Sequence, residues 1–140
     1  MQIGVPKETA EGERRVALVP DVVRKLIAAA GEQEAPQNEV IVERGAGEGA
    51  LIPDAQYEEA GAKLADGPEE VFRAEVVVKV APPSSEEIAR LQSGSVILGF
   101  LQPLTNGDGV RAIAQSGATS FALESVPRIS RAQSMDALSS

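Results

Sequence analysis

The charged residues that follow the first apolar run of the chain include Lys7, Glu8, Glu13, Arg14 and Arg15. If that run is a strand of an open α/β sheet, these residues lie at the carboxyl edge, where such folds bind ligands. Two neighbouring guanidinium groups could hold a carboxylate or a phosphate through paired hydrogen bonds. Glu13 and Arg14 fit a solvated surface equally well, so the residue types leave both interpretations open.

A lysine interrupts one of the most apolar runs of the chain, Val76-Val77-Val78-Lys79-Val80. Burial of an unpaired ammonium inside a sheet is strongly unfavourable. We therefore expect Lys79 either to project from the carboxyl end of a strand into a cleft, where it could touch a ligand, or to pair with a carboxylate.

A glycine-rich segment, Gly45-Ala46-Gly47-Glu48-Gly49-Ala50, matches the G-x-G-x-x-A form of the dinucleotide-binding fingerprint. That fingerprint requires the glycines to open a helix whose N-terminus faces a pyrophosphate. Pro53 follows at once and disfavours helix at Ile52. We therefore favour a glycine-rich turn over a phosphate site, and the Gly-Lys-Ser/Thr of a P-loop is missing as well.

The polar run from Pro127 to Ser140 combines arginines, an amide, a carboxylate and hydroxyls within a short span. These groups suit the carboxamide and ribose of a nicotinamide nucleotide. The alternative is a linker that leads to a helix near Ser134 or Asp136.

Composition narrows the possible chemistry. The 140 residues suit one domain, and the net charge of −8 disfavours nucleic acid as a partner. The chain has no cysteine and no histidine, so it lacks disulfides, thiolate nucleophiles and the commonest metal ligands, and we expect no metal site. We find neither a secretory signal nor a membrane-spanning apolar run, and expect a soluble cytosolic chain that could dock on a membrane complex through partners.

Short apolar runs alternate with amphipathic stretches, which predicts a three-layer Rossmann-like (flavodoxin-like) α/β fold, a parallel sheet with helices on both faces. The predicted strands are Ile3 to Val5, Val40 to Val42, Val76 to Val80, Val96 to Phe100 and Thr119 to Leu123. The predicted helices are Pro20 to Ala30 with Gly31 as its cap, Asp54 to Ala60, Pro68 to Phe72, a capping-box helix from Ser84 through Leu91, and Asp108 to Gln115. The polar stretch from Glu32 to Glu39 is predicted to be a surface loop.

Several of these segments together resemble one family. Ile3 to Glu8, Gly12 to Leu18 and the Gly45 to Ala50 turn resemble the N-terminal domain shared by alanine dehydrogenase and NAD(P) transhydrogenase. The resemblance covers essentially the whole chain. The run from Pro127 to Asp136 is similar to the transhydrogenase alpha subunit in particular.

The resemblance to transhydrogenase implies roles for the last run. The segment from Arg128 to Ser139 would be a loop that reaches the nicotinamide of NAD(H), with Arg128, Asp136 and Ser139 in contact with that nucleotide. Gln133 would reach across to NADP(H) carried by a partner subunit and act as the catalytic residue. Hydride transfer between two nicotinamides needs apposition and no side-chain acid or base, so the absence of histidine is no objection.

The resemblance to alanine dehydrogenase would instead place Arg15 and Lys79 on the substrate carboxylate and carbonyl, with a histidine as proton carrier in the stretch that reads Phe100-Leu101-Gln102. Gln102 stands where that histidine belongs and cannot exchange a proton near neutral pH. We therefore regard Arg15 and Lys79 as structural charges of the shared domain.

These considerations lead to one expectation for the whole chain. Residues 1–140 form the family's N-terminal domain, truncated before a dinucleotide-binding domain, in a transhydrogenase alpha subunit that couples hydride transfer to proton translocation. Its expected partners are the membrane and NADP(H)-binding subunits and a second copy in a homodimer, at the cytoplasmic side of the inner membrane. The alternatives are an alanine dehydrogenase-like oxidoreductase and a non-catalytic binding or dimerisation fragment.

Overall fold

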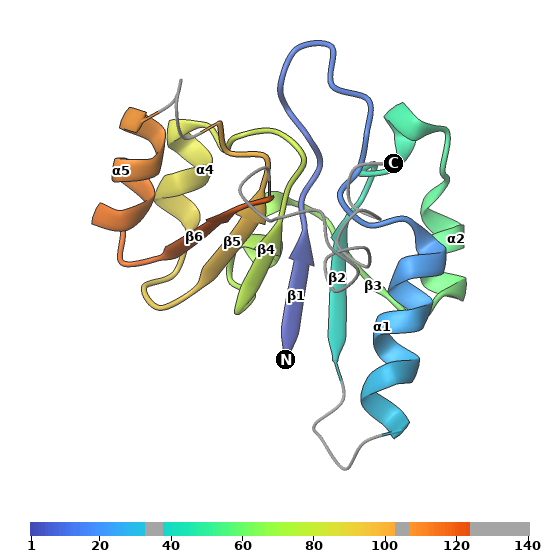
Figure 1. Ribbon diagram of the computed structural model, residues 1–140. Coiled ribbons are helices and arrows are strands. Elements are labelled where there is room, and N and C mark those ends of the chain that lie inside the picture. The colour runs from blue at the N-terminus through green and yellow to red at the C-terminus, as the bar shows by residue number, and fades with distance from the viewer. Residues whose placement is uncertain (33–37, 103–106, 124–140) are drawn as a thin grey trace.

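A computed structural model describes residues 1–32, 38–102 and 107–123, and Figure 1 shows its elements. The strands of this part of the chain are β1 Gln2–Val5, β2 Glu39–Glu43, β3 Lys63–Ala65, β4 Val76–Val78, β5 Val96–Gly99 and β6 Thr119–Ala122. The α-helices are α1 Pro20–Glu32, α2 Asp54–Glu59, α3 Pro68–Phe72, α4 Ser85–Arg90 and α5 Gly107–Gln115, and a 3₁₀ turn, η1, spans Glu48–Ala50.

The six strands form one sheet in the order β3-β2-β1-β4-β5-β6, and every neighbouring pair is parallel. This confirms the predicted fold class. The strand β3 was not predicted: without it the order of the other strands is that of flavodoxin, and with it the order is that of the Rossmann fold. β3 escapes detection because it is short and contributes only one large apolar residue, Leu64.

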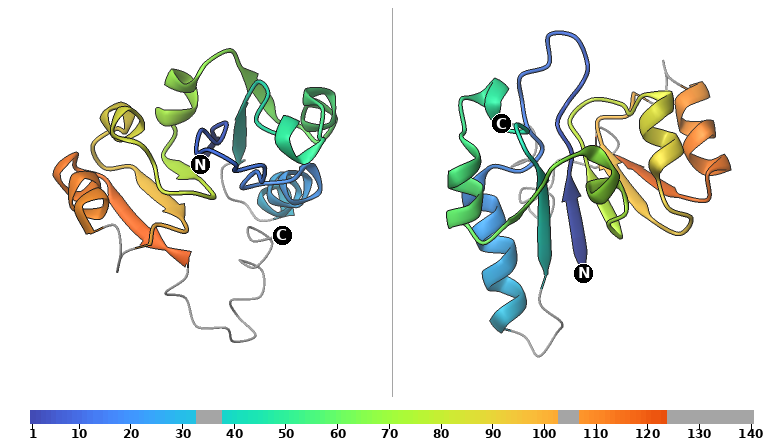
Figure 2. Two further views of the ribbon diagram at one scale, coloured as in Figure 1. Left: turned by 90° about the horizontal axis from the view of Figure 1, so that it is seen from above. Right: turned by 180° about the vertical axis from the view of Figure 1, so that it is seen from behind.

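Two apolar cores lie on opposite faces of the sheet. The end-on view in Figure 2 shows helices on both sides of the sheet. Helices α1 and α2 cover one face, where Val23 and Tyr57 pack against Val5 and Val42. Helices α3, α4 and α5 cover the other face, where the core members include Val71, Phe72, Val77, Ile88, Ile97 and Ile113. The central strands are apolar on both sides, as a covered parallel sheet requires.

Local sequence signals explain most helix boundaries. The predicted capping box opens α4: the Glu87 N–H donates to Ser84 Oγ over 3.2 Å, and the Ser84 N–H donates to Glu87 Oε1 over 2.9 Å. The prediction that Gly31 caps the first helix is wrong, because α1 continues to Glu32. Isolated glycines are tolerated within helices at a cost of about 1 kcal/mol.

The remaining predictions concern strand ends, the polar loop and membrane spans. β4 ends at Val78, β5 at Gly99 and β6 at Ala122, within two residues of the predicted ends. Residues 33–37 of the predicted Glu32 to Glu39 loop lie outside the described residues. No helix in the described part of the chain is long and apolar enough to cross a membrane.

Candidate functional site

The chemistry-bearing residues gather at the carboxyl edge of the sheet, above β1 and β4. β1 leads into the loop that contains Glu8 and Arg15, and Lys79 directly follows β4. These two strands are adjacent and mark the point where the strand order changes direction. Open α/β folds bind their ligands at this position.

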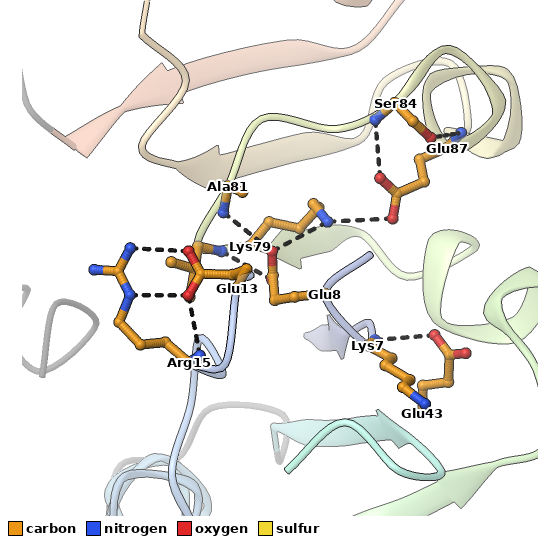
Figure 3. Close-up of polar contacts among 10 residues, drawn as sticks. Lys7, Glu8, Glu13, Arg15, Glu43, Lys79, Ala81, Ser84 and Glu87 are labelled. Carbon is orange, nitrogen blue, oxygen red and sulfur yellow. Dashed lines mark hydrogen bonds and ion pairs between the residues drawn. The ribbon is translucent and has the colours of Figure 1, made fainter. Parts of the chain in front are cut away.

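Lys79 is buried between two carboxylates (Figure 3). Its Nζ lies 3.3 Å from Glu8 Oε1 and 3.2 Å from Glu87 Oε2, and 1% of its side chain is exposed. Of the two arrangements open at the sequence level, pairing with a carboxylate is therefore correct, and projection into a cleft is not. We call Glu8, Lys79 and Glu87 the buried charge cluster.

Backbone groups complete the hydrogen bonding of this cluster. The Val80 N–H donates to Glu8 Oε2 over 2.9 Å, and the Ala81 N–H donates to Glu8 Oε1 over 3.0 Å. Glu87 divides its carboxylate between the capping box of α4 and Lys79. Two carboxylates against one ammonium leave one negative charge in excess, and these backbone donors stabilise it. The cluster thus ties the β1 loop to the start of α4.

Arg15 binds a carboxylate within its own loop, that of Glu13. Its Nε and one terminal nitrogen donate to the two carboxylate oxygens of Glu13 over 3.0 and 2.9 Å, and its backbone N–H donates to the same carboxylate. The side-chain hydrogen bond from Arg15 lowers the pKa of Glu13, and the same bond raises the pKa of Arg15. Arg15 therefore makes to Glu13 the paired hydrogen bonds that the sequence suggested for an external carboxylate or phosphate. Arg14 is exposed.

A cavity of about 440 Å³ lies beside the cluster and is shared by the ends of β1 and β2 and the starts of α3 and α4. Its wall carries cations, hydroxyls and carboxylates together: Lys7, Thr9, Glu43, Pro68, Ser84, Ser85, Glu86, Glu87 and Arg90. The Lys7 N–H donates to Glu43 Oε1 over 2.9 Å. In the described part of the chain, no group of acidic residues has an arrangement that could hold a metal ion.

The glycine-rich segment forms a turn, as the sequence favoured. It leads into the three-residue η1 and not into an α-helix, so it offers no helix N-terminus to a pyrophosphate. A Cβ on Gly47 would lie 2.7 Å from the Ile52 carbonyl oxygen, and one on Gly49 would lie 2.9 Å from Arg14 Cα. Gly49 therefore allows the β2 loop to pack against the β1 loop, and Gly47 allows the turn to pack closely against Ile52.

Gln102 follows β5 at the same edge, with an exposed side chain and a φ of 52°. This left-handed conformation is uncommon for a residue other than glycine. The four residues predicted to act on nucleotides, Arg128, Gln133, Asp136 and Ser139, lie outside the described residues.

The family follows from the agreement of sequence and fold. A model described as "Alanine dehydrogenase/PNT, N-terminal domain" matches residues 4–140. The chain belongs to this family.

Relatives of two kinds contain this N-terminal domain. The chain is 43% identical over its whole length to an NAD(P) transhydrogenase alpha-subunit polypeptide of Rhodospirillum rubrum and spans 36% of that protein. It is 37% identical over 90% of its length to the alanine dehydrogenase of Bacillus subtilis and spans 32% of it. The chain therefore covers about a third of the length of these relatives.

Solved structures give the same picture for the alanine dehydrogenase/PNT N-terminal domain. The transhydrogenase of Sinorhizobium meliloti superposes with a TM-score of 0.86 at 40% identity, over 99% of this chain and 40% of that one. An L-alanine dehydrogenase superposes with a TM-score of 0.81 at 32% identity, over 89% of this chain and 32% of that one.

Sequence reasoning missed the second role of Glu87. It identified Glu87 as the capping residue of α4, but not as a partner of Lys79. A signal was available in the spacing, because the capping residue follows the buried lysine by only eight positions across a short connection.

Proposed function

We propose that this chain is the N-terminal portion of the NAD(H)-handling alpha subunit of a proton-translocating NAD(P) transhydrogenase. The observation that carries the proposal is the match to the R. rubrum transhydrogenase alpha-subunit polypeptide over 100% of the chain. Matches to alanine dehydrogenases cover 90% of the chain at 37 to 39% identity. In such a subunit the chain would help to pass hydride between NAD(H) and NADP(H), with proton movement carried by other subunits.

The proposal assigns the nucleotide contacts to the last segment of the chain. Arg128, Asp136 and Ser139 contact the nicotinamide nucleotide of NAD(H), and Gln133 reaches NADP(H) on the partner subunit. An amide at position 133 can orient the two nicotinamides without exchanging a proton. Direct hydride transfer needs this orientation and no acid or base from a side chain.

Two observations on the described residues favour this function over amino-acid oxidation. Lys79 is buried between Glu8 and Glu87, so it is not presented to a small carboxylate substrate, and Arg15 already pairs with the carboxylate of Glu13. Gln102 occupies the position at which the alanine dehydrogenase resemblance calls for a proton-carrying histidine.

The remaining elements of the proposal concern assembly. The 140 residues act as the N-terminal domain of a longer subunit whose main NAD(H) site lies in a following dinucleotide-binding domain. That subunit works as a homodimer with NADP(H)-binding and membrane partners, on the cytoplasmic side of the inner membrane.

The test uses the complete subunit, produced from the full reading frame, together with its NADP(H)-binding partner. Hydride transfer from NADPH to an acetylpyridine analogue of NAD is followed by the absorbance of the reduced analogue. We expect transfer in the parent and a rate lower by roughly 10- to 100-fold in Gln133→Asn, because small misplacements of reacting groups have effects of that size.

The matched control is Gln115→Asn, the same change on the exposed side of α5, which should leave the rate unaltered. Absence of transfer in the parent, or equal rates for the parent and Gln133→Asn, would overturn the proposal. NAD-dependent formation of pyruvate from alanine by the same preparation would establish the amino-acid oxidoreductase instead.

A further inference from the structure

Gln102 has a backbone conformation that residues other than glycine rarely adopt. Its φ of 52° lies in the left-handed region, where the Cβ of an L-residue comes too close to the following carbonyl oxygen. Pro103 follows directly, and a residue before proline is driven toward extended backbone instead. Glutamine at this position therefore opposes the local conformation, and glycine would remove the conflict with the Cβ.

The other residues with a positive φ in the described part of the chain have simpler explanations. Most of them are glycines, with φ values of 80 to 100°, at Gly12, Gly45, Gly61, Gly94 and Gly117. Leu51 is the second non-glycine residue of this kind among those described, with a φ of 62°. It ends the 3₁₀ turn η1, where its N–H donates to the Glu48 carbonyl over 3.0 Å. Gln102 follows a strand and ends no helix, so a cap does not account for its conformation.

Gln102 lies at the carboxyl edge of the sheet, between the ends of β4 and β6. Pairing of the first two strands continues past their ends, because the Phe100 N–H donates to the Val80 carbonyl over 3.2 Å. On the other side, Gly99 of β5 is in register with Ala122, the last residue of β6. The chain therefore leaves β6 beside the end of β5, and the segment predicted to bind NAD(H) follows in the sequence. The Gln102 side chain is exposed at this edge.

We propose that the side-chain amide of Gln102 binds the carboxamide of the nicotinamide in NAD(H). The proposal rests on the proposed function, which brings a nicotinamide nucleotide to the segment after β6. A glutamine amide and a nicotinamide carboxamide each offer N–H donors and a carbonyl acceptor, so the two can form paired hydrogen bonds. This contact fixes the plane of the carboxamide and with it the orientation of the ring, on which hydride transfer depends.

A binding role also explains why glycine does not occupy position 102. Strained backbone conformations cluster at functional sites, where the side chain is needed in spite of its unfavourable backbone. The strain and the contact can be separated by two substitutions. Gln102→Gly removes the amide and relieves the backbone, whereas Gln102→Ala removes the amide and keeps the left-handed strain.

The test measures NADH binding to the complete subunit by fluorescence titration, without the NADP(H)-binding partner. Two other ligands identify the group that is recognised. ADP-ribose has no nicotinamide, and the reduced acetylpyridine analogue carries a methyl group in place of the carboxamide N–H donors. Leu51→Gly is the matched control, because it relieves the same kind of backbone strain at a side chain that is 90% exposed.

We expect both Gln102 variants to weaken NADH binding by roughly three- to tenfold, the effect of one hydrogen-bonded contact. Binding of ADP-ribose should be unchanged, and binding of the acetylpyridine analogue should weaken less than that of NADH. Gln102→Gly should also raise the melting temperature. Leu51→Gly should raise it too, but without any effect on NADH binding.

Equal NADH affinity in the parent and both Gln102 variants would overturn the proposal. An equal loss for NADH and ADP-ribose would overturn it as well, because the substitution would then act on the site as a whole. A parent that binds NADH through Gln102 but transfers no hydride to the partner's nucleotide would contradict the proposed function and support this assignment, so the two can fail separately.

Discussion

Replacement of Lys79 by methionine tests whether the buried charge cluster stabilises the domain. Methionine fills a similar volume but leaves Glu8 and Glu87, with side chains 2% and 6% exposed, without their shared cation. Removal of one member of a buried ion pair typically destabilises a protein by about 3 to 5 kcal/mol. The backbone N–H groups of Val80 and Ala81 still bind Glu8, so we expect about 3 kcal/mol.

Urea unfolding measures this change. For an m value of about 2 kcal/mol per molar, a loss of about 3 kcal/mol lowers the midpoint by roughly 1.5 M. Unfolding is followed by far-ultraviolet circular dichroism and by the fluorescence of Tyr57, the single tyrosine in a chain without tryptophan.

Two further variants make the result decisive. Lys63→Met removes a lysine that also pairs with a glutamate, Glu39, but whose side chain is 68% exposed, so its effect should stay below about 1 kcal/mol. In Lys79→Met/Glu87→Gln the buried negative charge of residue 87 is also removed, and glutamine can still accept the capping-box hydrogen bond. This double variant should therefore be more stable than Lys79→Met. Equal midpoint shifts for Lys79→Met and Lys63→Met would refute the reasoning.

Four other substitutions follow from the described geometry. Tyr57→Phe removes a buried hydrogen bond of 2.8 Å to the Leu18 carbonyl and should cost about 1 to 2 kcal/mol in urea unfolding. Burial raises the pKa of Tyr57 from 10.0 to about 12, so the parent should lose stability as the pH rises from 10 to about 12, while Tyr57→Phe lacks this loss; a parent with the same alkaline profile as the variant would contradict this. Gly49→Ala places a Cβ 2.9 Å from Arg14 and should destabilise by about 1 to 3 kcal/mol, whereas Gly107→Ala meets no atom within 4 Å and should be neutral or stabilising by thermal unfolding. Ser95→Ala removes a buried hydroxyl that finds no hydrogen-bond partner among the described residues, and a rise in melting temperature, equivalent to up to about 1 kcal/mol, is expected; a clear fall would show that the hydroxyl is satisfied.

The fold was largely predictable because its signals are local. Apolar runs such as Val96 to Phe100 indicate buried strands, and Ser84 with Glu87 indicates the start of α4 without reference to any other segment of the chain. The edge strand β3 was missed because Lys63 and Ala65 carry no apolar pattern, and pairing with β2 decides its conformation.

The candidate site was predictable only in part, because its contacts join distant segments. The sequence showed that Lys79 needed a partner or a cleft, but nothing in it selected Glu8, whose contacts with Val80 and Ala81 span more than 70 positions. The Arg15 side chain could be matched with Glu13 only once the loop conformation was known. The predictions for Arg128, Gln133, Asp136 and Ser139 remain predictions.

The buried charge cluster also constrains the order in which the chain can fold during synthesis. Glu8 leaves the ribosome among the first residues, and the N–H groups of Val80 and Ala81 that bind it follow 72 and 73 positions later. Until then β1 can pair with β2, and Glu8 stays hydrated, so the unfavourable step of removing its charge from water waits until Lys79 and Glu87 can join it. Closure of the cluster therefore cannot precede the synthesis of α4, and it accompanies the docking of β4 against β1, before β5 and β6 need to be in place.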